Sequence, residues 1–404
     1  MRASGRLAVI AALLLSAANA PVRVLEMVEP GPLVVVQAYL KAPDNMTERE
    51  AASWQVLGRV LLQGTVEFTP QVLRNYGGQA GVPPSVTVMP DFLRVQIVLP
   101  RSGLSLAGDL MSAVLMRPLL REDDIAIVKA ELQSAEQSAW ISALAGLDFR
   151  YDRIREGDVR NVWTRALRPE NLSFVVGGGF DPGAGMAELE RRFERWTAPR
   201  DPGPPRVDGP ARPKTSYSEP VSTFMLTART MTPASAASAA KLLAVFALGV
   251  GQEASMHRVL RESLGLSYLQ SAVLWPTNKG WTPSFLMVRR TENEEAKHAS
   301  EMKAALLADV EKWKDHDLVR AKAIAEAAFT RNLSSSPVWL GPDGPMTQSL
   351  FDRCAWRGYL EMVGSGVLRE QVMVGAMQNV DLEQLQAAAK ELLEECNVGW
   401  VPGR

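Results

Sequence analysis

The sequence contains few of the residues from which metal centres and disulfide scaffolds are built. It has two cysteines, Cys354 and Cys396, and three scattered histidines, His257, His298 and His316. Cysteine-rich zinc modules need closely spaced sets of such ligands, so that class is excluded. Because an exported protein can form disulfides, the two cysteines either pair with each other or remain as two buried thiols.

An excess of charge of one sign is also missing, as is any long apolar run beyond the N-terminus. The 44 Lys and Arg balance 45 Asp and Glu to a formal net charge of -1, which offers no global attraction for nucleic acid. No stretch after residue 20 approaches the ~20 apolar residues of a spanning helix. With 404 residues, 47% hydrophobic and 22% charged, the chain has the composition of a soluble globular protein of two domains.

Familiar catalytic patterns are missing as well. No serine lies in a G-x-S-x-G elbow, so a hydrolase of that type is not indicated. Gly177–Gly179 follows a predicted strand but lacks the G-x-G-x-x-G spacing of a dinucleotide site, and a turn is predicted there. No set of residues for another catalytic nucleophile assembles from the sequence.

The N-terminus has the pattern of a secretory signal peptide. Arg2 and Arg6 precede the apolar stretch 7–15, and residues 18–20 read A-N-A, a typical cleavage site. We expect cleavage after Ala20 and a mature protein that is periplasmic or secreted, with no integral membrane segment. An uncleaved N-terminal anchor is the alternative.

The mature chain reads as an α+β protein in two halves. Thr47 and Glu50 form a capping box that predicts a helix start. Residues 198–213, APRDPGPPRVDGPARP, are too rich in proline and glycine for helix or sheet interior. We therefore predict a signal peptide, an N-terminal domain, a linker and a C-terminal domain, with the bounds 1–20, 21–198, 199–216 and 217–404.

Each half follows the same plan: a strand, a helix, two paired strands, further helices and a last strand. The predicted strands are 33–40, 86–89, 92–99 and 172–176 in the first half, and 223–228, 267–274, 284–289 and 398–401 in the second. In residues 92–99, apolar and polar side chains alternate, which predicts a half-buried strand of an antiparallel sheet. We expect two duplicated domains, each an antiparallel sheet flanked by helices.

Residues 51–65, AASWQVLGRVLLQGT, resemble the zinc helix of an inverted zincin without its metal ligands. Such helices carry H-x-x-E-H, two imidazoles for the metal and a glutamate as general base. The corresponding positions here hold Gln55, Gly58 and Arg59 within Q-V-L-G-R. An amide, a missing side chain and a permanent cation are poor substitutes. Taken alone, the segment is equally compatible with an ordinary amphipathic helix.

The second half carries a more specific pattern. Residues 260–268, LRESLGLSY, resemble the L-R-E-x-x-G-L-[AS]-Y signature of pitrilysin/insulinase-type peptidases and mitochondrial processing peptidases, and Gly249–Gly251 resembles the glycine turn before it. The order of elements also matches over the mature chain, including N-L-S-F-V-V-G at 171–177. The resemblance implies two α+β domains hinged into half of a clam shell. Gly265 is suited to end the helix in a left-handed conformation.

The resemblance also implies roles for single residues. Glu131 stands where the family places its third zinc ligand. Arg261 and Tyr268 correspond to the pair that, in two-subunit members, holds substrate across from the zinc of the other subunit. The alternative is that Arg261 pairs with a carboxylate of its own domain and Tyr268 is merely packed. His257 stands where the family often has an aromatic residue.

These features favour a non-catalytic, substrate-binding subunit of a heterodimeric zinc metallopeptidase. The expected partners are a homologous zinc-bearing subunit and a peptide or unfolded protein substrate, with no nucleic acid. No independent activity and no cofactor are expected, zinc being held by the partner alone. Two alternatives remain: a structural subunit like the core proteins of the respiratory bc complex, and a module that captures unfolded peptides.

Overall fold

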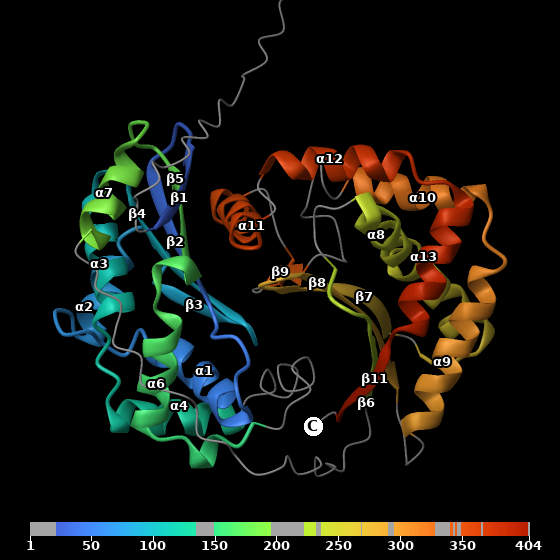
Figure 1. Ribbon diagram of the computed structural model, residues 1–404, viewed down its shortest axis with the longest axis horizontal. Helices are drawn as coiled ribbons and strands as arrows, with labels where there is room; N and C mark the ends of the chain where they lie inside the picture. Colours follow the sequence, from blue (N-terminus) through green and yellow to red (C-terminus); the bar gives the residue numbers. More distant parts are fainter. Residues whose placement is uncertain are drawn as a thin grey trace, which may run out of the picture.

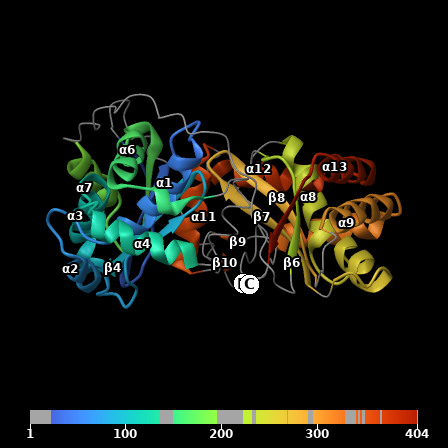
Figure 2. The same cartoon turned by 90° about the horizontal axis from the view of Figure 1, so that it is seen from below.

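The protein consists of two α+β halves joined side by side (Figures 1 and 2). The computed structural model describes residues 22–134, 149–194, 222–231, 236–267, 269–289, 295–327, 340–341, 344–345, 349–364 and 367–402. The predicted signal peptide and the proline-rich linker lie outside these ranges. Within them, no helix is both long and apolar enough to cross a membrane.

The N-terminal half is built on a five-stranded sheet with the order β1-β5-β2-β4-β3. Its strands are β1 (Arg23–Val28), β2 (Leu33–Lys41), β3 (Ser85–Val88), β4 (Phe92–Pro100) and β5 (Leu172–Gly178). The helices of this half are α1 (Glu48–Val60), α2 (Pro70–Gly77), α3 (Leu104–Met116), α4 (Glu122–Ser134), α6 (Glu156–Ala166) and α7 (Ala184–Phe193). Short 3-10 turns are η1 (Arg101–Gly103), η2 (Tyr151–Arg153) and η3 (Pro169–Asn171).

The C-terminal half has a four-stranded antiparallel sheet with the order β11-β6-β8-β7. Its strands are β6 (Ser222–Thr227), β7 (Leu269–Thr277), β8 (Gly280–Arg289) and β11 (Asn397–Pro402), and β9 (Leu340–Gly341) and β10 (Gly344–Pro345) form a separate two-residue pair. Its helices are α8 (Ala236–Gly249), the π-helix η4 (Met256–Ser263), α9 (Glu295–Val310), α10 (Asp315–Glu326), α11 (Leu350–Met362), α12 (Val367–Gln378) and α13 (Leu382–Glu394).

The N-terminal sheet is not antiparallel throughout, which corrects the sequence expectation. β1, which the sequence reading missed, pairs in parallel with β5 along the edge of the sheet. The other four strands are antiparallel and lie in the order β5-β2-β4-β3, the order of β11-β6-β8-β7 in the second half. The predicted strand pairs in both halves are confirmed. Met302, Leu306 and Val310 form the buried apolar face of α9.

The alternation of side chains along β2 explains why this sheet is buried on both faces. Val34 and Val36 point into the core beneath α1 and α3, whereas Val35 and Tyr39 point into the core that continues into the second half. Successive residues of a strand face opposite sides of the sheet, so an unbroken apolar run of this kind requires cover on both sides.

The second cover is α11, a helix of the C-terminal half (Figure 1). The Tyr39 hydroxyl donates to the carbonyl of Ala355 at 2.8 Å, and Gln37 Nε2 donates to the carbonyl of Phe351 at 3.1 Å. A Cβ at Gly358 would overlap with the Tyr39 ring, so glycine permits the close approach of helix to sheet. β4 is therefore not half-buried as expected, because α11 covers the face that carries Arg94, which is 4% exposed.

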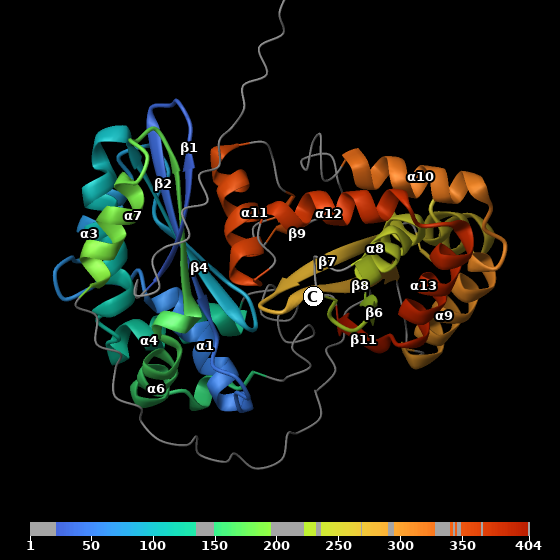
Figure 3. The ribbon, with the colours of Figure 1, turned by 45° about the horizontal axis from the view of Figure 1, so that its top comes forward.

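The tip of the β7–β8 hairpin makes a second contact between the halves (Figure 3). The backbone N–H of Asn278 donates to Oδ2 of Asp91 at 2.9 Å, and the Asn278 amide donates to the Asp91 carbonyl at 3.0 Å. Asp91 lies in the turn between β3 and β4, and burial raises its pKa to about 6 against the charges of Lys279 and Lys41. The two halves are thus held together at α11 and at this turn.

Both cysteines are free and buried, so the two-thiol alternative is the one observed. Cys354 lies on α11 and packs directly over Gly177, where a Cβ would overlap with its Sγ. Gly177 and Gly178 belong to β5 rather than to a turn, and their missing side chains make room for α11 and for the Leu33 carbonyl.

Candidate functional site

The helix α1 begins where the capping box predicts. The Thr47 side chain accepts from the backbone N–H of Glu50, and the Glu50 carboxylate accepts from the backbone N–H of Thr47 at 2.9 Å. Arg165 of α6 donates to the same carboxylate. Because of their spacing along the helix, Gln55, Gly58 and Arg59 share one face of α1.

Gln55 occupies the first ligand position and serves as a structural hydrogen-bond donor. It is 1% exposed, and its Nε2 donates to the Met89 carbonyl at 3.3 Å. The indole N–H of Trp54 donates to the same carbonyl at 2.9 Å. Met89 lies in the turn that also carries Asp91, so the two side chains tie α1 to the turn that contacts the second half. Buried polar groups are stable when they are bonded in this way.

Gly58 occupies the general-base position and is closed by packing. A Cβ at this residue would overlap with Cγ2 of Val88, because α1 lies directly against β3. Arg59 follows in the last turn of the helix and is half-buried. An amide committed to a carbonyl, a glycine in contact with a valine and a permanent cation do not fit a zinc ion, which needs anionic or imidazole ligands and an open position.

Glu131 lies on α4, which packs against α1, as the resemblance to the zinc peptidases requires. The residue is exposed. Across the described ranges, no group of three or more His, Cys, Asp or Glu side chains is placed to hold a metal ion. The role of Glu131 as the remnant of a third ligand stays a prediction.

The second region of interest is η4, the π-helix that carries Arg261. Its i→i+5 pattern is visible at the end, where the backbone N–H of Leu264 donates to the carbonyl of Val259 at 3.0 Å. Gly265 then adopts a φ of 58°, and the N–H of Leu266 returns to the carbonyl of Leu260 at 2.7 Å. The left-handed end predicted at Gly265 is confirmed, although the helix it ends is a π-helix. π-Helices are rare and occur frequently at functional sites.

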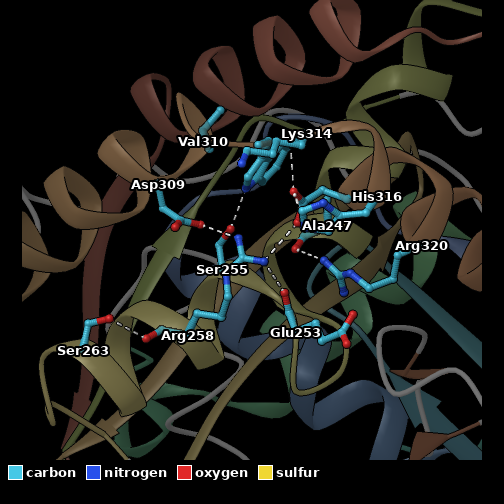
Figure 4. Close-up of polar contacts among 12 residues, drawn as sticks. Ala247, Glu253, Ser255, Arg258, Ser263, Asp309, Val310, Lys314, His316 and Arg320 are labelled. Carbon is cyan, nitrogen blue, oxygen red and sulfur yellow. Dashed lines mark hydrogen bonds and ion pairs between the residues drawn. The ribbon is translucent and has the colours of Figure 1, made fainter.

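Arg258 anchors η4 to the helices α9 and α10 (Figure 4). Its guanidinium donates to Asp309 at 2.9 Å and to Asp317 at 3.0 Å. Burial alone would raise the pKa of Asp317, which is 2% exposed, but a hydrogen bond from the Lys314 backbone N–H and the Arg258 charge lower it overall. At the C-terminal end of η4, the Ser263 hydroxyl donates to the Arg258 carbonyl at 3.0 Å.

Two further sets of hydrogen bonds lie beside the Arg258 contacts and involve buried residues. The indole N–H of Trp313 donates to the Ser255 hydroxyl at 2.8 Å, and Arg320 donates to the carbonyls of Ala247 and Val250 at the end of α8. Figure 4 draws Ser255, Ala247 and Arg320 together with the contacts of Arg258. Sequence reading missed this network. The available signal was a set of charged residues within apolar helices, which does not indicate which charges meet.

Arg261 is exposed, and its Nη1 lies 3.3 Å from Nε2 of His257. Tyr268, its predicted companion, lies outside the described residues, so their expected proximity stays a prediction. The following strand is well fixed: the Ser267 Oγ lies 2.7 Å from the Leu269 carbonyl and 2.6 Å from the Val288 carbonyl, and its single hydrogen can bond either. The start of β7 is therefore tied to β8. The residues at α1 and η4 belong to different halves and form two separate regions.

No family model and no curated protein matches this sequence. Solved structures match nearly all of it. The peptidase M16 inactive domain from Pseudomonas fluorescens aligns with a TM-score of 0.71 at 15% identity, over 95% of this chain and 97% of its own. A protease from Helicobacter pylori aligns with a TM-score of 0.72 at 14% identity, over 95% and 98%. A conserved protein from Enterococcus faecalis V583 aligns with a TM-score of 0.63 at 12% identity, over 95% of this chain and 97% of its own.

At these identities the likeness concerns the fold. The chain has the fold of an M16, or pitrilysin-type, peptidase domain. The fold expected from the motif at residues 260–268 is therefore confirmed.

Proposed function

We propose that this chain, which has the fold of an inactive M16 peptidase domain, is the non-catalytic, substrate-binding subunit of a two-chain zinc metallopeptidase. One contrast carries the proposal. The helix that would hold the metal has no room for a side chain at Gly58, the general-base position, whereas the segment around Arg261 keeps the motif and leaves Arg261 exposed. A homologous partner would bind the zinc.

In this arrangement Arg261 and Tyr268 act on the substrate. A guanidinium binds a carboxylate or carbonyl oxygen through parallel N–H groups, and a phenol donates one hydrogen bond. Donors held in place across from a metal-bound carbonyl stabilise the charge that develops on its oxygen. Arg258, fixed to Asp309 and Asp317, supplies the rigid base that such positioning requires.

Two further proposals concern the whole chain. Residues 1–20 direct export and are removed after Ala20, so the pair works in the periplasm or outside the cell. The two halves arose by duplication, and the shared order of their four antiparallel strands supports this origin.

The test is co-expression with a zinc-bearing chain of similar length that carries H-x-x-E-H, sought first in the neighbouring gene. We expect the two chains to copurify and peptides to be cleaved by the pair alone. Arg261→Ala and Tyr268→Phe should each lower kcat/KM about 100-fold, as expected when a donor to the transition state is removed. Arg229→Ala is the matched control, since Arg229 is an 80% exposed arginine of the same half.

A pair that assembles and cleaves at an unchanged rate with both substitutions would exclude the shared site. A stable homodimer without a peptidase partner or bound peptide would favour a scaffold. Binding of labelled peptides by the isolated chain, without cleavage by any pair, would favour peptide capture.

A further inference from the structure

The π-helix η4 brings a histidine and a glutamate to Arg261. Nε2 of His257 lies 3.3 Å from Nη1 of Arg261, and Nδ1 of the same ring lies 3.4 Å from Oε1 of Glu262. The imidazole thus stands between a cation and a carboxylate, one at each ring nitrogen. The His257 side chain is 15% exposed, whereas Glu262 is 62% exposed.

The helix type accounts for this grouping. In an α-helix, residues five apart point about 140° away from each other, so Glu262 would face away from His257. A π-helix has about 4.4 residues per turn, so residues four and five apart lie on either side of the same line along the helix. Arg261 and Glu262 therefore both reach the ring of His257.

The rest of η4 is fixed, so this grouping cannot rotate away. Met256 and Leu260 are buried in the core of the second half, and Arg258 is held by Asp309 and Asp317. The side of the helix that carries His257 is thereby set by contacts on its other sides.

The partners of the ring favour one tautomer of the neutral imidazole. A neutral histidine has one donor and one acceptor nitrogen, and its tautomer is assigned from what each nitrogen faces. Arg261 can only donate, so Nε2 must accept. Nδ1 is buried, makes no hydrogen bond within the described residues and has the Glu262 carboxylate as its nearby acceptor. A proton on Nδ1 places a donor beside this carboxylate and leaves Nε2 as an acceptor for Arg261, whereas a proton on Nε2 would place two donors face to face.

We infer that His257 and Glu262 are positioning residues for Arg261: Glu262 holds His257 in the Nδ1–H form, and Nε2 of His257 accepts from the guanidinium and fixes its direction. The consequence for substrate binding rests on the function proposed above. The geometry itself belongs to the isolated chain and can be tested without a partner.

The first test is nitrogen NMR of the histidine rings in the full-length mature chain, labelled with 15N. The chain has three histidines, and the His257 signals are identified by their loss in His257→Gln. We expect a protonated Nδ1 and an unprotonated, hydrogen-bonded Nε2. Glu262→Ala should shift the ring towards the Nε2–H form, and Glu262→Gln, which keeps an acceptor, should not. His316, which is 66% exposed, should be unaffected and serves as the internal control.

The second test measures rotation of the Arg261 guanidinium by NMR. His257→Phe keeps a flat ring without an acceptor and should speed this rotation, whereas His257→Gln, which keeps an acceptor oxygen, should restore slow rotation. With the cleaving pair, His257→Phe should lower kcat/KM about tenfold, the loss expected for one hydrogen bond to a charged group, and His257→Gln should recover most of it. A purely structural role would not be rescued in this way.

The outcomes separate the two proposals. A His257 ring in the Nε2–H form, or Arg261 rotation unchanged in His257→Phe, overturns the positioning inference even if Arg261→Ala abolishes cleavage. Conversely, the expected tautomer and rotation, together with cleavage unchanged in Arg261→Ala, confirm the positioning and contradict the proposed function.

Discussion

The helix α1, which follows β2, and the helix η4, which follows α8 and precedes β7, differ in what their polar residues do. In α1 the polar side chain of Gln55 is turned inward and bonded to a backbone carbonyl, and Gly58 is in contact with Val88. In η4 the buried side is anchored by Arg258 while Arg261 stays exposed. A retained fold with one closed helix and one open helix is what separation of metal binding from substrate binding would produce.

The largest effect is expected at the anchor of η4. Arg258→Met removes the guanidinium from Asp317, a carboxylate that is 2% exposed, and leaves this buried charge with the Lys314 backbone N–H and the exposed imidazole of His316 as its remaining contacts. The free energy of unfolding should fall by ~3–5 kcal/mol, measured by urea denaturation. Arg160→Met, which breaks the exposed pair with Glu156, is the matched control and should cost less than about 0.5 kcal/mol. Equal losses in the two variants would show that η4 is not held by its buried charges.

The next effect concerns the closed helix. Gly58→Ala places a methyl group against Val88 and should lower the free energy of unfolding by about 2 kcal/mol through overpacking. Adding Val88→Ala should recover part of that loss, which links the effect to this contact. Gly375→Ala in α12, where a Cβ meets nothing within 4 Å, should instead stabilise by ~0.5–1 kcal/mol. A Gly58→Ala variant as stable as the wild type would mean that α1 has room for a side chain.

The smallest expected effect is the pH dependence of the free energy of unfolding, which differs between the turn beside α1 and the anchor of η4. The pKa of Asp91, in the turn that accepts from Gln55, is raised to about 6 from 3.8, so its stabilising contribution is present below pH 3.8 and is lost as the pH rises to about 6. The pKa of Asp317 beside η4 is lowered, so its contribution is present above 3.8 and is lost only at more acidic pH. The two carboxylates therefore titrate with opposite sign.

Asp91→Asn should remove the first dependence. Relative to this variant, the wild type should lose about 1–2 kcal/mol of unfolding free energy between pH 4.5 and 7.5, after allowance for partial exposure and screening. Asp317 does not interfere, since its pKa lies below this window. If the difference in unfolding free energy between the wild type and Asp91→Asn does not change with pH, Asp91 is not buried where the two halves meet.

Much of this structure could be predicted from local signals in the sequence. The capping box at Thr47, the left-handed end at Gly265 and the strand β4 each depend on neighbouring residues, and each was found where predicted, although β4 is buried on both faces. The motif that ends at Tyr268 predicted the fold. The zinc-like helix was placed correctly because its apolar spacing does not depend on metal ligands.

What the sequence could not show depends on contacts between distant segments. The pattern of α11 marks an apolar face but not the sheet of the other half that it covers, and β1 is recognisable only by its pairing with β5. Nothing in residues 256–263 distinguishes a π-helix from an α-helix, so the meeting of His257 with Glu262 could not be foreseen. Gly58 likewise became informative only once Val88 was placed beside it.

Metal content tests the central claim most directly. The isolated chain, purified without chelators and measured by plasma mass spectrometry, should contain no stoichiometric zinc, and the assembled pair should contain about one zinc ion, lost when the partner's H-x-x-E-H histidines are replaced. One zinc ion per isolated chain, lost on substitution of Glu131, would contradict the closed site at α1 and with it the division of roles between the two subunits.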